Sequence, residues 1–275
     1  MAFNDNAVFT ASTGYIYLAP VGTAAPTPAQ LKNFDPEAFG AHTYLLGEVT
    51  GESFTLTVGS GTTEPLKKDA SAAEVQAALE KLPTVGTGGA LVKGLTLEQG
   101  YTVSFIGESF GKEVTLTAEG AAANEVDKPI GWEPVGHTGN EDLPEFGYDG
   151  GDSETKGSWQ KKNLREVTTE APVDYVTVKA LQFDAETLEL YYGKNASSVD
   201  GVFGVDNPAT NGVERAVLIV LVDGQFKIGF SAAKASIRRD ESISLATDDF
   251  ATLPLRATFT KHPGRHLFEW TAPAA

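Results

Sequence analysis

Cysteine is absent from this 275-residue chain. The protein therefore has no disulfide and no thiolate chemistry, which suits assembly in a reducing cell. Long apolar segments are also missing, because the longest run, residues 216–222, is far too short to span a bilayer. The N-terminus shows no basic region followed by an apolar core, so we expect no secretory signal. These absences predict a protein that is made inside the cell and is not inserted in a membrane.

Basic residues are scarce relative to acidic ones. Thirty-seven Asp and Glu against 21 Lys and Arg give a formal net charge of −16. Such a surface repels DNA phosphates, because DNA binding depends on Lys and Arg that release counterions. Two interpretations remain open: the charge keeps the protein soluble, or it forms a surface past which nucleic acid moves without being held.

Residues suited to catalysis or metal binding are few and poorly spaced. A proline and a glycine separate His262 from His266, so the two cannot share a helix face as zinc ligands do in HExxH motifs. The acidic run at 149–154 lacks the pattern of a calcium loop and indicates a solvated loop. Residues 107–112 lack the length and the Ser or Thr of a phosphate-binding loop and indicate a hairpin loop. We expect no enzymatic activity, no metal and no cofactor.

Residues 41–129 differ in composition from the rest of the chain, because they are rich in Thr, Gly, Ala and Val. Apolar residues alternate with polar ones at 54–58, 101–105 and 114–118, which predicts three strands. The spacing of Ser71 and Glu74 is that of a capping box, and it predicts a helix over residues 71–82. Small residues and prolines flank the segment. We therefore expect 41–129 to be a small α+β domain inserted into a domain formed by 1–40 and 130–275.

The larger, discontinuous domain has the pattern of a β sandwich with a flanking helix. Alternation predicts strands at 173–183 and 253–259, and Asp184 caps a predicted short helix that ends at Gly193. Asp-Gly at 223–224 predicts a two-residue hairpin turn.

That turn fixes a predicted register in which Leu221 lies opposite Phe226 and Val217 opposite Phe230. One face of the hairpin is then wholly apolar and belongs in the core. The other face, with Leu218, Val220 and Lys227, is half apolar and fits either a surface covered by another subunit or one exposed late in assembly.

Several separated motifs of the larger domain recur together in a known family. Residues 131–146 read GWEPVGHTGNEDLPEF, and the runs DGGD at 149–152 and KGSWQ at 156–160 follow in order. The N-terminal GYIYLAPVGT at 14–23 and LELYYG at 188–193 complete the set. In these motifs the chain resembles the major tail proteins, or tail tube proteins, of long-tailed siphophages that infect actinobacteria. The resemblance covers 1–40 and 130–275 and does not include the insertion.

The resemblance implies a tail-tube fold, a mainly β sandwich with a flanking helix whose long hairpins join those of neighbouring subunits. It implies a virion structural protein that assembles in the host cytoplasm as hexameric rings, stacked into the tail tube. Other tail proteins, such as the tape measure and the tail terminator, are the implied partners. DNA is expected to pass through the lumen during ejection without specific binding, and the insertion to project outside the tube.

Aromatic residues, which are core or interface anchors rather than a ligand cage, and half-apolar positions give the candidate subunit-interface residues. They are Trp132, His137, Phe146, Trp159, Leu218, Val220, Lys227, Phe268 and Trp270. The chain ends, 1–9 and 266–275, are either arms that reach neighbouring subunits or solvated termini. The alternative function is a surface-exposed carbohydrate-binding or adhesion β protein, and a tail-associated hydrolase ranks third.

Overall fold

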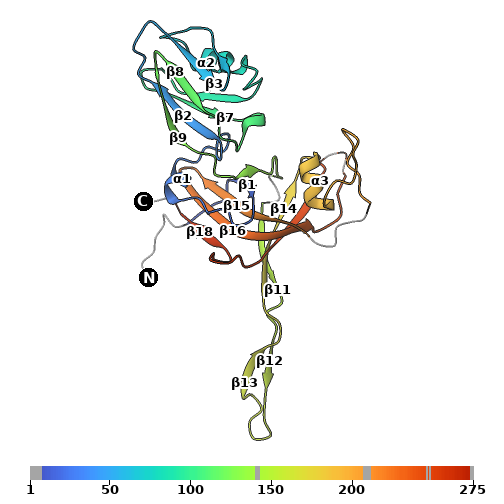
Figure 1. Ribbon diagram of the computed structural model, residues 1–275. Helices are drawn as coiled ribbons and strands as arrows, with labels where there is room; N and C mark the ends of the chain where they lie inside the picture. The colour runs from blue at the N-terminus through green and yellow to red at the C-terminus, as the bar shows by residue number, and fades with distance from the viewer. Residues whose placement is uncertain (1–7, 140–142, 207–211, 246, 248, 273–275) are drawn as a thin grey trace. The chain divides into compact units, whose positions relative to one another are not determined.

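The computed structural model describes residues 8–139, 143–206, 212–245, 247 and 249–272. Contacts between Cα atoms divide the chain into two compact units (Figure 1). One unit consists of Met1–Asn33 with Pro134–Ala275, and the other is Phe34–Glu133. Both are built mainly from antiparallel strands, as the sequence predicted. The longest helix described has nine residues, and no described helix is both long and apolar enough to cross a membrane.

An eight-stranded antiparallel sheet forms the first unit, in the order β10-β1-β15-β16-β17-β14-β11, with β18 paired to β16. Its strands are β1 (Thr13–Ala19), β10 (Glu133–Pro134), β11 (Glu145–Asp149), β14 (Val173–Ala180), β15 (Val213–Asp223), β16 (Phe226–Arg239), β17 (Leu253–Phe259) and β18 (Glu269–Thr271). The predicted strand at 253–259 is confirmed, whereas the one at 173–183 ends three residues early, at Ala180.

The sheet curls so that its two halves face each other across one core. Ile16 of β1 and Val176 of β14, from strands far apart in the sheet order, are buried in the same apolar cluster. Residues 135–139 connect the two ends: the Val135 N–H donates to the Ile16 carbonyl at 2.9 Å, and Thr138 forms a bridge with Ala180. The sandwich expected from the alternating pattern is thus made by a single folded sheet.

The hairpin of β15 and β16 has a different register from the predicted one. Leu221 pairs with Ile228 and Ile219 with Phe230, so the turn lies at Gly224-Gln225. The predicted pairing was wrong by two residues because Asp223 closes the ladder opposite Phe226 instead of entering the turn. A shift of two keeps every side chain on its predicted face, and Val217, Ile219 and Phe230 are in the core as expected.

Two helices pack on this sheet. Helix α3 (Ala185–Tyr192) is capped by Asp184, which accepts from the Thr187 N–H at 2.9 Å, and it ends at Gly193 with φ 91°, as predicted. Helix α1 (Pro28–Lys32) was not predicted. Its buried Leu31 lies over Gly229, the cross-strand partner of Val220, so the chain itself covers the face that we expected another subunit to cover.

The second unit contains two small sheets and one α-helix. One sheet has the order β6-β7-β2-β9, and the other has the order β4-β3-β5 with β8 on β3. The elements are β2 (His42–Gly47), β3 (Ser53–Val58), β4 (Gly61–Thr62), β5 (Leu66–Lys67), α2 (Ala72–Glu80), β6 (Ala90–Lys93), β7 (Tyr101–Phe105), the 3₁₀ turn η2 (Gly107–Ser109), β8 (Leu116–Glu119) and β9 (Ala122–Asp127).

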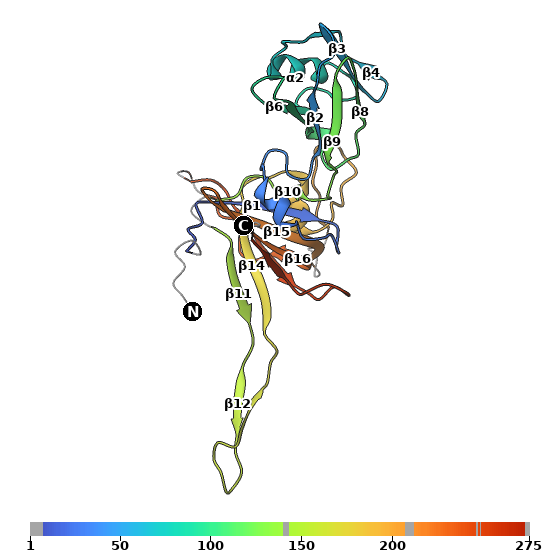
Figure 2. The same ribbon diagram turned by 90° about the vertical axis from the view of Figure 1, so that its left-hand side faces the viewer.

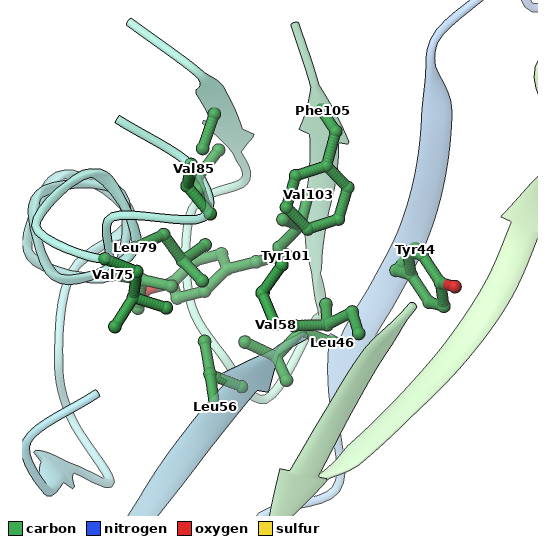
Figure 3. Close-up of a cluster of buried hydrophobic side chains, with 14 of the residues drawn as sticks. Tyr44, Leu46, Leu56, Val58, Val75, Leu79, Val85, Tyr101, Val103 and Phe105 are labelled. Atoms are coloured by element: carbon green, nitrogen blue, oxygen red, sulfur yellow. The ribbon is translucent and has the colours of Figure 1, made fainter. Parts of the chain in front are cut away.

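The helix of this unit is α2, and both hydrogen bonds of its predicted capping box are present. Its Val75 and Leu79 point toward side chains of β3 and β7 in an apolar core (Figure 3). Residues 107–112 do not form the expected hairpin loop. They connect β7 to β8, which pair with other strands and belong to different sheets.

Candidate assembly surfaces

The most prominent feature of the first unit is a long hairpin between β11 and β14. β11 pairs with β14 from Glu145↔Thr177 to Asp149↔Val173. Beyond Gly150 and Gly151, both at positive φ, β12 (Ser153–Lys156) pairs with β13 (Arg165–Thr168). We call residues 150–172 the arm. Figures 1 and 2 show it leading away from the sheet, and nearly all of its side chains are exposed. The acidic run at 149–154 is therefore a bend between paired strands.

The arm ends in a basic tip, residues 156–165. This stretch has four basic and no acidic residues, in a chain of net charge −16. The KGSWQ motif at 156–160 runs from the end of β12 into the turn of the tip, where the Ser158 N–H donates to the Lys161 carbonyl at 2.7 Å. Trp159 is fully exposed, at 103% of its reference area. Because tryptophan buries a large apolar area in most proteins, its position at this tip indicates a contact surface.

Arg256 of β17 joins the base of the arm to the sheet. Its guanidinium carbon lies 3.5 Å from the centre of the Tyr175 ring, and it forms an ion pair with Asp149. Its Nη1 is 3.8 Å from Oδ1 of Asp240. Gly147, opposite Tyr175, has no side chain to collide with the ring: a Cβ there would lie 2.6 Å from Tyr175 Cζ. These contacts fix where the hairpin leaves the sheet.

Three expected interface residues come together beside the arm. Phe146, Phe268 and Trp270 surround the buried Phe230, with ring centres 4.7, 5.5 and 5.0 Å from it. Trp270 belongs to β18, which pairs with β16 at Phe230. Phe146 and Trp270 remain 41% and 53% exposed. The described part of the C-terminal end therefore packs on the sheet of its own chain. The exposed parts of Phe146 and Trp270 form an aromatic surface there. Of the N-terminal end, residues 1–7 lie outside the described residues.

The other expected interface residues are scattered. Trp132, Leu218 and Val220 are buried within the chain, which leaves them no surface for a partner. His137 is exposed, and its N–H donates to Gln182 Oε1 at 2.7 Å. Lys227 is half-buried and donates to the Lys32 carbonyl at 3.3 Å. Helix α1, which lies over the cross-strand partner of Val220, starts at Thr27-Pro28-Ala29-Gln30 with a capping box and a proline at the first helical position.

Comparison with known proteins identifies the family. The family model described as phage tail tube protein matches residues 1–84 and 112–275. This chain belongs to the phage tail tube protein family. It is 39% identical to major tail protein Gp23 of Mycobacterium phage D29 over 270 residues, which are 98% of this chain and 93% of the relative. Major tail protein Gp23 of Mycobacterium phage L5 matches to the same extent.

The tail tube relatives correct one expectation. The resemblance was expected to exclude residues 41–129, but both relatives align with nearly the whole chain, so this segment is not peculiar to it. Among solved structures, a chain from Mycobacterium phage Patience is 20% identical, covers 36% of this chain and 50% of its own, and has a TM-score of 0.28. This likeness is too low to inform the fold.

Family membership establishes the general role. The chain is a structural protein of a phage tail, related to major tail proteins of phages that infect mycobacteria. The family is a structural one, in agreement with the prediction that the protein is not an enzyme. Within the described residues, no group of three His, Cys, Asp or Glu side chains is placed to hold a metal ion.

Proposed function

We propose that this tail tube protein assembles as hexameric rings that stack head to tail, forming the conduit through which DNA is ejected. The observation that carries the proposal is the family match over most of the chain, in a molecule whose β11–β14 hairpin continues as an arm without a core of its own. A hairpin of this kind gains stability when its strands or side chains are covered by neighbouring copies. Tube assembly supplies such neighbours.

The remaining expected interface residues fit this proposal as contacts between copies. They are His137, Phe146, Trp159, Lys227, Phe268 and Trp270. Phe146 and Trp270 form one aromatic surface at the base of the arm, and Trp159 lies at its tip. Exposed aromatic residues are frequent anchors of protein interfaces. The aromatic surface and the tip are therefore the first places to test.

The net charge of −16 supports a conduit for DNA. A lumen that repels phosphate groups lets DNA slide without being bound. We expect the positions that face the lumen to be net acidic. Tape measure and tail terminator proteins are the proposed partners, the virion tail is the final location, and assembly takes place in the host cytoplasm.

We further propose that the second unit is an inserted domain on the outside of the tube. The compact unit Phe34–Glu133, which largely coincides with the predicted 41–129, supports this proposal. It has an apolar core of its own, with Leu46, Leu56 and Val103 fully buried. A domain with its own core can be added to a subunit without altering the fold that carries it.

An adhesion function for this outer unit is the second candidate. A cavity of about 1000 Å³ is lined by Glu48, Glu52, Lys67, Leu95 and Tyr101, among others. Its size and its mixed polar and apolar lining fit a small ligand such as a sugar. Saturable glycan binding by the purified protein would favour this candidate.

Electron microscopy of the purified protein and of virions tests the leading proposal. Stacked rings with sixfold symmetry are expected, together with continuous tubes when the other tail proteins are present. A protein that remains monomeric even with those partners would contradict it, as would a map whose lumen is lined mainly with Lys and Arg.

A further inference from the structure

The tip of the arm is poorly suited to stand alone in water. Lys156 and Arg165 lie directly opposite each other in the β12–β13 ladder. Like charges in opposing positions of an antiparallel pair repel, and Glu154, 3.8 Å from Lys156 Nζ, offsets only one of the two charges. Lys161 and Lys162 add two more positive charges in the turn, beside the fully exposed Trp159 and the exposed Leu164. A partner surface that is both acidic and apolar would neutralise these positive charges and cover the exposed apolar side chains.

The first unit carries a surface with the complementary character. It consists of Asp184, α3 and the loop that follows, residues 184–206, which we call the α3 surface. This stretch has five acidic residues and one basic residue. Glu186, Asp200 and Asp206 are exposed. Apolar side chains lie among these charges, and Val199 and Val202 are 64% and 49% exposed.

The loop of the α3 surface is held in a defined conformation. Asn195 Oδ1 accepts from the N–H groups of Ser197 and Gly204, at 2.9 and 2.8 Å. The Ala196 N–H donates to the Gly204 carbonyl at 2.9 Å. These hydrogen bonds join the two ends of the loop. They therefore hold the segment that carries Val199, Asp200 and Val202 in a defined conformation. A preorganised surface loses less entropy when it binds.

The tip is directed away from the α3 surface of its own chain. Helix α3 packs on β16 and β17, while the arm leaves the sheet at β11 and β14 and extends away from it (Figure 1). A strand of about ten residues spans about 33 Å, so the tip reaches well beyond the sheet. The partner of the tip is therefore a second molecule.

We infer that the tip of one copy docks on the α3 surface of another copy in the assembled tail. This inference rests on the proposed function and adds the identity of the contact. Each contact is small and carries opposite charges of similar size, so long-range attraction guides it. Because the same contact repeats around a ring, many individually weak contacts together stabilise the assembly. The attraction is screened by salt, because the charges of both surfaces are exposed.

A charge swap tests the pairing in the full-length protein. Lys161→Glu with Lys162→Glu is expected to raise the critical concentration for tube assembly about tenfold at moderate salt. Adding Glu186→Lys and Asp200→Lys to the same chain is expected to bring it back within about threefold of the wild type. The matched control, Lys81→Glu with Lys112→Glu, changes the net charge equally on exposed residues of the second unit. It is expected to assemble as the wild type does. Normal assembly of the tip variant, or no rescue by the swap, would overturn the inference.

Cross-linking tests the same contact without requiring tubes. The natural chain has no cysteine, so any disulfide reports an introduced pair. A Ser158→Cys copy mixed with a Val199→Cys copy should form a disulfide-linked dimer in oxidising buffer. A Ser158→Cys copy mixed with a Leu95→Cys copy, whose residue 95 is even more exposed (88% against 64% for Val199), should not. Cross-linking without rings would support the docking and contradict the proposed hexameric assembly. Rings without selective cross-linking would contradict the docking alone.

Discussion

Among single residues, Ser71 and Glu74 form a capping box that is expected to make the stability of α2 depend on pH. The Ser71 N–H donates to Glu74 Oε2 at 2.8 Å, and the Glu74 N–H donates to the Ser71 hydroxyl at 3.3 Å. Hydrogen bonds from the Ser71 backbone and hydroxyl lower the pKa of Glu74 below its ordinary value of 4.5. A carboxyl whose pKa is lowered by folding stabilises the fold above its unfolded pKa. That contribution is lost as the pH falls through the folded pKa.

Ser71→Ala is expected to destabilise α2 by about 1 kcal/mol at neutral pH, because the N-cap acceptor is lost. It should also remove part of the loss of stability below pH 4.5, since the pKa of Glu74 returns toward its ordinary value. Hydrogen exchange of the α2 amides at neutral and acidic pH measures both effects. Ser60→Ala, in an exposed turn, is the control. An unchanged difference between the two pH values would refute the role of the capping box.

Arg256 is the second residue whose effect can be isolated. Lysine keeps its charge but cannot stack flat on Tyr175 while pairing with both Asp149 and Asp240. Arg256→Lys is therefore expected to speed hydrogen exchange at the β11–β14 amides several-fold, with the core of the sheet unchanged. Arg215→Lys, at an exposed position of β15, is the control. Equal exchange in the two variants would show that Arg256 does not fix the base of the arm.

Among the elements, α1 is short, yet its buried Leu31 packs on the main sheet. Its five residues place Leu31 over Gly229, where a Cβ would lie 2.9 Å from Leu31 Cδ1. Leu31→Ala is expected to destabilise the first unit by about 3 kcal/mol, because a fully buried leucine leaves a cavity. Leu245→Ala, at a side chain 79% exposed, should cost less than about 0.5 kcal/mol. Urea unfolding of both variants measures the difference, and equal losses would mean that α1 covers nothing.

The elements also show how far sequence reasoning reaches. Helices α2 and α3 were predictable because local side-chain caps mark their ends. Helix α1 has the same signal at Thr27, but five residues are too few for an apolar periodicity to appear. The β15–β16 faces were predictable from alternation, whereas the register was not, since Asp223 fits either the turn or the ladder. The packing of Leu31 over Gly229, the cross-strand partner of Val220, joins residues nearly 200 positions apart and has no local signature.

At the scale of the whole molecule, the remaining question is whether the second unit takes part in assembly. Two features indicate that residues 41–129 can be deleted without unfolding the first unit. The cut ends adjoin, because a Cβ at Gly40 would lie 2.3 Å from the Trp132 carbonyl oxygen. The sheet of the first unit retains its own core, which includes Val176, Ile219 and Phe230.

Replacing residues 41–129 with a short Gly-Ser linker is therefore expected to leave ring and tube formation intact and to thin the outer profile of the tube. Electron microscopy of tubes made from the shortened and the full chain measures both outcomes. If the shortened chain folds, as judged by hydrogen exchange of its sheet, yet forms no rings, the second unit belongs to the subunit interface. In that case the proposal of an outer, dispensable domain is wrong, because a domain outside the interface cannot be required for closure of the ring.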